Sequence, residues 1–133
     1  MAEETEPEKR TETEGASGTE DGAHRLIVMR PEEHAVYSSE KMGKSTLFQS
    51  PNVLVGLNAF EPGQEHALHT HDDMDKVYYV VSGHGLFLLD GRELDMRGGE
   101  MLIAPQGVPH GIRNTGDVRL LVMAVLAPAP GGK

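Results

Sequence analysis

Two stretches of this chain decide its fold: residues 63–71 read GQEHALHTH, and residues 99–114 read GEMLIAPQGVPHGIRN. His69 and His71 are two positions apart, so both rings project from one face if this segment is a β-strand. In the second stretch a proline and a glycine, two positions apart, indicate a tight turn that aims His110 from the start of its own strand. Two imidazoles side by side and a third from another strand predict a metal site.

The chain around these stretches is also rich in predicted strands. Short apolar runs of Val, Leu, Ile and Tyr alternate with Gly, Pro, Asn and Asp, a pattern typical of an all-β sandwich or barrel. Asp90-Gly91 predicts a β-hairpin with a type I′ turn. Residues 31–45 are polar, and a helical turn or a loop fits residues 32–37 equally well. The expected strands are residues 26–29, 53–60, 67–71, 77–82, 85–89, 93–96, 101–103, 110–113 and 119–126.

Composition narrows the classes of protein. The length of 133 residues suits one domain. Residues 1–24 hold eight acidic and two basic side chains and little apolar surface, so they predict a disordered acidic leader. A barrel is expected over residues 25–127, with its motifs in 53–125, and a flexible tail over 128–133.

The remaining composition limits the partners and the metal ligands. The sequence has no basic patch, which argues against a nucleic-acid partner. It also has no long apolar run and no secretory leader, which argues against a membrane partner and against export, so a cytoplasmic location is expected. Because the chain has no cysteine, disulfides and thiolate ligands are excluded.

Both histidine stretches resemble the signature motifs of the cupin superfamily, in its small single-domain bacterial form. The resemblance covers about residues 53–125. It implies a double-stranded β-helix, or jelly-roll barrel, that holds one divalent transition metal, which could be Fe, Mn, Ni, Co, Cu or Zn. The family pattern G-x5-P-x-G-x2-H-x3-N matches at Gly99, Pro105, Gly107, His110 and Asn114, and G-x5-H-x-H-x(3,4)-E-x6-G matches at Gly63, His69, His71 and Gly83.

The chain departs from the family pattern at the glutamate. Lys76 occupies that position, preceded by Asp75. A protonated lysine is not a metal ligand and repels a nearby divalent cation. A one-residue bulge could turn Asp75 inward as the fourth ligand. His66 could replace the glutamate, although its spacing from His69 places it on the opposite face of a strand unless it lies in the turn.

We favour a third alternative, a site of His69, His71 and His110 with water or substrate in the open positions. Three neutral imidazoles leave the charge of a divalent metal uncompensated, so such a site favours a small anionic, chelating compound. An inward Lys76 would strengthen this preference and could serve as a catalytic acid or an anchor. Tyr78 has the strand parity of Lys76 and is therefore expected to line the substrate pocket.

The predicted function is that of a metal-dependent enzyme, dioxygenase-like or another lyase or isomerase, acting on a small anionic oxygenated compound. Some cupins that resemble this chain use three-histidine iron sites to cleave carbon–carbon bonds in diketones. A barrel that has lost its metal, a non-catalytic binding or sensor protein, and a sugar isomerase or epimerase are the alternatives. The apolar, non-alternating run of residues 120–126 predicts a homodimer.

Overall fold

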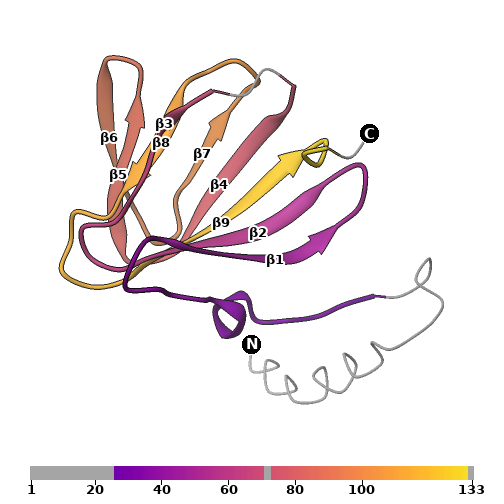
Figure 1. Ribbon diagram of the computed structural model, residues 1–133, viewed down its shortest axis with the longest axis horizontal. Helices are drawn as coiled ribbons and strands as arrows, with labels where there is room; N and C mark the ends of the chain where they lie inside the picture. The colour runs from indigo at the N-terminus through magenta and orange to yellow at the C-terminus, as the bar shows by residue number, and fades with distance from the viewer. Residues whose placement is uncertain (1–25, 71–72, 132–133) are drawn as a thin grey trace, which may run out of the picture. The chain divides into compact units, whose positions relative to one another are not determined.

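The strands of the computed structural model, which describes residues 26–70 and 73–131, form two antiparallel sheets (Figure 1). A 3-10 helix, η4 (Pro31–His34), precedes them. The five-stranded sheet has the order β1 (Gly43–Gln49), β2 (Leu54–Phe60), β9 (Leu120–Ala127), β4 (Asp75–Ser82) and β7 (Met101–Ala104). The four-stranded sheet has the order β3 (Glu65–His69), β8 (His110–Arg113), β5 (His84–Leu89) and β6 (Arg92–Arg97). The expected all-β, double-stranded β-helix class is confirmed.

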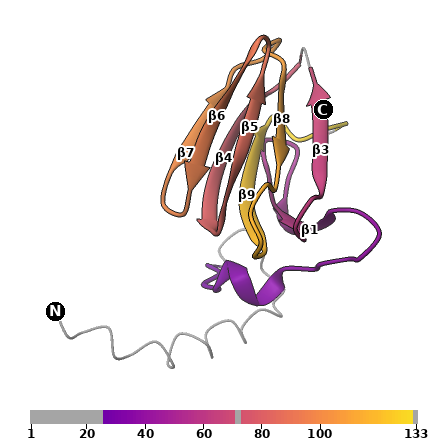
Figure 2. The ribbon, with the colours of Figure 1, turned by 90° about the vertical axis from the view of Figure 1, so that its left-hand side faces the viewer.

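The hydrophobic core lies between the two sheets, which Figure 2 shows from a second side. Along β4 buried and less buried side chains alternate, because successive residues of a strand face opposite sides of the sheet. Both sheets contribute to the core, which consists of Phe60, Tyr78, Val80, Phe87, Met96, Ile112, Leu120, Val122 and Ala124.

The predicted strands agree with the structure except near the start of the described chain. The strand expected over residues 26–29 is wrong: residues 26–30 form no strand and lie outside the compact unit that begins at Pro31. β1 was not expected, because its sequence GKSTLFQ is polar at most positions and lies on a sheet edge with one exposed side. The helical-turn alternative near residue 32 is confirmed by η4.

Several tight turns depend on glycine. The motif glycines Gly63, Gly83, Gly99 and Gly107 all have positive φ, between 83° and 91°, which other residues rarely adopt. The Asp90-Gly91 hairpin is present, with Leu89 opposite Arg92. Its turn is not type I′, however: among the described residues only glycines have positive φ, so only the second turn position has the left-handed conformation that type I′ needs at both.

Some expectations fall outside the part of the chain that the structure describes. They are the acidic leader of residues 1–24 and the orientation of His71. The domain boundaries and the flexible tail of residues 128–133 therefore stay predictions. Within the described ranges, no helix has the length and apolar character needed to cross a membrane.

Candidate functional site

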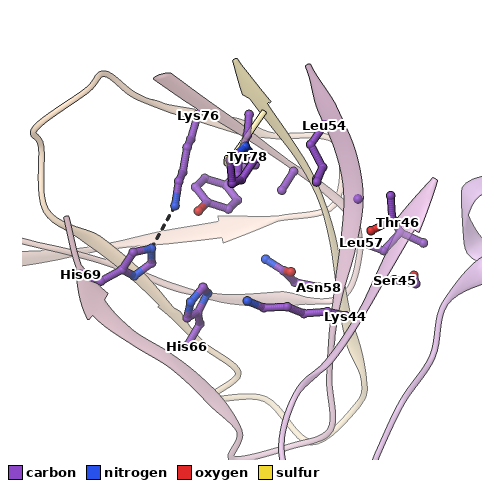
Figure 3. Close-up of a pocket in the computed structure, with 14 residues that line it drawn as sticks. Lys44, Ser45, Thr46, Leu54, Leu57, Asn58, His66, His69, Lys76 and Tyr78 are labelled. Carbon is purple, nitrogen blue, oxygen red and sulfur yellow. Dashed lines mark hydrogen bonds between the residues drawn. The ribbon is translucent and has the colours of Figure 1, made fainter. Parts of the chain in front are cut away.

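A pocket of about 480 Å³ opens between the sheets, beside the histidines of β3 (Figure 3). Strands from both sheets build it, and its polar side chains come from β1, β2, β3 and β4. The described residues that line it include two lysines and two histidines but no carboxylate. They are Lys44, Ser45, Thr46, Leu54, Gly56, Leu57, Asn58, His66, His69, Lys76, Tyr78, Ala124, Leu126 and Pro130.

A bulge in β3 places His66 and His69 on the same side of the strand. His66 pairs with Ile112 and His69 pairs with His110, so three steps along β3 oppose two steps along β8. The rings of His66 and His69 consequently stack, with centroids 4.4 Å apart and an interplanar angle of 22°. The expectation that the spacing puts His66 on the other face is wrong, because strand parity does not hold across a bulge.

The orientation of two imidazoles is set by backbone carbonyls. His69 Nδ1 lies 2.8 Å from the Ala67 carbonyl oxygen, and His110 Nδ1 lies 2.9 Å from the Val108 carbonyl oxygen. A carbonyl only accepts, so both Nδ1 atoms carry the proton and Nε2 is the acceptor of each ring. The His69 and His110 centroids are 4.4 Å apart, which brings two predicted ligands together.

Lys76 points into the pocket and meets His69 (Figure 3). Its side chain is buried, with 4% of the residue exposed, and its ammonium Nζ lies 3.1 Å from His69 Nε2. Because Nε2 is the acceptor of that ring, the lysine donates this hydrogen bond. Burial lowers the pKa of Lys76, the charge of Lys44 lowers it further, and Asp73 opposes the shift.

Asp75 does not join the histidines. It is exposed, and its carboxylate accepts a hydrogen bond of 2.8 Å from the backbone N–H of Gln106. The bulge that would turn it inward is absent there: β4 pairs with β9 in unbroken register from Asp75 to Val80. The structure thus contradicts Asp75 as a fourth ligand, because regular alternation turns Lys76 inward and Asp75 outward.

The two other pocket residues of interest are His66 and Tyr78. Within the described residues the buried Nδ1 of His66 has no hydrogen-bond partner. Burial, followed by the nearby His69 and lysine charges, lowers the pKa of His66 to about 4, so the ring is neutral at pH 7. Tyr78 lies in the pocket wall, with its ring 5.5 Å from that of His110, and burial raises its pKa.

Two pocket residues, Lys44 and Asn58, lie outside both histidine motifs of the sequence. Lys44 of β1 lies opposite Asn58 of β2 in the sheet, and both line the pocket. Their strands have no histidine motif, and β1 was not recognised as a strand. Alternation in β1 would have been the only sequence signal for an inward Lys44.

The described residues do not fit a metal as they are arranged. A metal bound to His69 must use Nε2, because Nδ1 carries a proton, and Nε2 already accepts a hydrogen bond from a lysine ammonium. Among the described residues, no group of three His, Asp or Glu side chains is arranged to hold a metal ion. His71, the third predicted ligand, lies outside the described ranges.

Comparison with known proteins agrees with the fold. Residues 56–126 match the Cupin domain family model. The chain is similar to the oxalate-binding protein of Thermotoga maritima, with 28% identity over 102 residues that cover 77% of this chain and 84% of the relative. It is also similar to the acireductone dioxygenase of Bacillus velezensis, with 26% identity over 124 residues that cover 85% of this chain and 66% of the relative. A crystal structure from Thermus thermophilus has a TM-score of 0.74 and 36% identity, and covers 77% of this chain and 98% of that chain.

Proposed function

This chain belongs to the cupin domain family, and we propose that its barrel pocket binds a small oxygenated anion of the carboxylate class. The observation that carries the proposal is the lining of the pocket: among the described residues it presents Lys44 and Lys76 and no carboxylate. A pocket of about 480 Å³ is within the range of small-molecule sites.

The electrostatics of the pocket favour an anion. A buried ammonium is costly unless it is paired. The ion pairs of the described residues do not include Lys76, which donates a hydrogen bond to the neutral imidazole of His69. Lys44 and Lys76 also repel one another, since the charge of Lys44 lowers the pKa of Lys76. A carboxylate between the two lysines would offset both the burial of the Lys76 charge and the repulsion between the two ammonium groups. Asn58 could contribute a further hydrogen bond to it.

The similarity to an oxalate-binding protein supports this ligand class. Titration calorimetry of the full chain with oxalate, malonate and malonamide tests it, because malonamide has nearly the shape of malonate but no charge. We expect the two dicarboxylates to bind and malonamide to give no heat of binding. Equal binding of malonate and malonamide, or no binding of any of the three, would contradict the proposal.

A metal-dependent enzyme with His69, His71 and His110 as ligands is the second candidate. It is favoured by the protonated Nδ1 atoms of His69 and His110, since carbonyl-held imidazoles with Nε2 as the acceptor are typical of metal ligands. The similarity to a dioxygenase supports it as well. Metal analysis of freshly purified protein tests this candidate. One transition-metal ion per chain supports it, and a content far below one that reconstitution does not raise contradicts it.

We also propose that two copies of the chain associate through the outer face of the five-stranded sheet. On this face the cross-strand neighbours form uncharged, apolar rows, and their edge residues Ile103 and Met101 are 60% and 56% exposed. Apolar side chains exposed to this extent suit a contact between two copies of the chain better than they suit water. The rows consist of Val55, Val125, Val77 and Ile103, and of Met123, Tyr79 and Met101. Leu57, the cross-strand neighbour of Met123, is 1% exposed and already packs within this chain.

Light scattering after size exclusion measures this assembly directly. We expect a dimer for the wild type and a monomer for Ile103→Glu. Val118→Glu is the matched control, because Val118 is also 60% exposed but lies in a loop outside the rows. A monomeric wild type at micromolar concentration would contradict the dimer, as would equal effects of the two substitutions. The cytoplasmic location stays a prediction of the sequence alone.

A further inference from the structure

We propose that the Lys76 ammonium is the resident cation of the pocket, held 3.1 Å from His69 Nε2, so that a carboxylate ligand binds it without any metal ion. This inference rests on the proposed anion-binding function. It assigns Lys76 as a binding residue and oxalate-like dicarboxylates as ligands of a metal-free site.

His69 has one lone pair that either the lysine or a metal ion can use. The neutral imidazole has one N–H and one lone pair. The N–H is used by the Ala67 carbonyl at 2.8 Å, which leaves only the lone pair on Nε2. The Lys76 ammonium donates to that lone pair, and a metal would need the same electrons at about 2 Å. Lysine and metal therefore compete for His69, and they exclude one another.

The backbone of β4 holds the Lys76 side chain in the pocket. Lys76 pairs with Leu126 of β9 on one side and Ala104 of β7 on the other, without a bulge at that point. Strand alternation therefore directs its side chain inward, where 4% of the residue is exposed. A protonated lysine in this position supplies a fixed positive charge.

The unused hydrogen-bonding capacity around this charge indicates where a ligand binds. An ammonium has three donors, and His69 accepts one of them. The neighbouring His66 carries a buried Nδ1 that has no partner within the described residues. A dicarboxylate could accept from Lys76 with one group and from the second pocket lysine, Lys44, with the other.

Substitution of Lys76 by glutamate or methionine tests the exclusion of metal. Lys76→Glu replaces the ammonium with a carboxylate beside His69, which is a metal-ligand pair, whereas Lys76→Met removes the charge without adding a ligand. Each full-length protein is stripped with EDTA and dialysed against Mn²⁺, Ni²⁺ or Zn²⁺. Bound metal is then counted by mass spectrometry, and oxalate binding is measured by calorimetry in EDTA.

We expect the wild type to bind oxalate equally well with and without EDTA and to hold far less than one metal ion per chain. Lys76→Glu should hold close to one metal ion per chain, and Lys76→Met should bind oxalate about tenfold more weakly or worse in EDTA, because a charge-assisted hydrogen bond is lost. Lys44→Met is the matched control: it removes the other pocket lysine and should leave metal uptake at the wild-type level.

The inference is overturned if the wild type takes up one metal ion per chain with Lys76 intact, or if oxalate binds only in the presence of metal. Equal metal uptake by Lys76→Glu and the wild type overturns it too. Circular dichroism shows whether each variant is folded, and Lys76→Gln replaces any variant that is not. If no protein binds oxalate under any condition, the proposed anion-binding function fails, and the metal counts still show whether Lys76 excludes metal.

Discussion

Replacing Gly111 by alanine should push the bulged segment of β3 away from β8 and displace the histidines that it carries. A Cβ at position 111 would lie 2.8 Å from the His66 carbonyl oxygen, 2.9 Å from Leu68 N and 3.0 Å from Ala67 C. All three are backbone atoms, so rotation of a flexible side chain cannot relieve the contact. The absence of a side chain at Gly111 thus allows the bulge to lie against β8.

The expected loss of stability follows from this crowding. Overpacking in a well-packed region costs about 1–3 kcal/mol, which lowers the melting temperature of a domain near 100 residues by about 4–24 °C. Gly98→Ala is the matched control. Its Cβ would meet nothing closer than the Val81 carbonyl oxygen at 3.6 Å, and its φ is not positive, so the change should stay within about 1 kcal/mol.

Thermal unfolding followed by circular dichroism, with oxalate titration of the folded proteins, measures both effects. We expect Gly111→Ala to melt lower than Gly98→Ala and to bind oxalate more weakly, because His66 and His69 move with the bulge. Identical melting temperatures and oxalate affinities for the two variants would show that the contact between β3 and β8 does not position the site.

Three further predictions test the packing and the electrostatics. Asn114→Ala should lower the free energy of unfolding, measured in urea, by about 2–4 kcal/mol, because the 1% exposed side chain makes three hydrogen bonds to backbone groups. A decrease of less than about 1 kcal/mol would contradict this. Burial lowers the pKa of His66 from 6.5 to about 4, so the unfolded chain binds a proton that the folded chain does not. The free energy of unfolding of the wild type should therefore fall, by less than about 3 kcal/mol, as the pH drops from about 6.5 to 4. His66→Gln should show a weaker fall. Equal pH dependence of the unfolding free energy in the two proteins would argue against a buried neutral ring. Phe87→Ala, at a position with 0% exposure, should cost about 3–5 kcal/mol, and Phe48→Ala, at 46% exposure, far less; similar losses would mean that the core is misplaced.

The sequence predicted the barrel well, because its turns and strands leave local signals. Gly63 and Gly107 mark turns that need positive φ, and both have it in the structure. The strand expected over residues 110–113 is β8 with the same bounds. β1 escaped prediction because an edge strand with one exposed side reads as a polar loop.

The arrangement of the site was harder to predict, since it depends on tertiary register. Periodicity placed His66 on the wrong face, because a bulge shows only when a strand is seen beside its partner. Whether Lys76 or Asp75 faces inward depended on the regular pairing of β4 with β9 from Asp75 to Val80, and no local signal in the sequence decides that. The hydrogen bond between Lys76 and His69 follows from both facts and could not be expected from either motif alone.

A crystal structure of the full chain soaked with oxalate, with anomalous data collected across the transition-metal absorption edges, tests the central claim most directly. The account predicts a carboxylate oxygen within hydrogen-bond distance of Lys76 Nζ and no anomalous peak beside His69 Nε2. An anomalous peak on His69 and His110, with the Lys76 side chain turned away from the pocket, would contradict it.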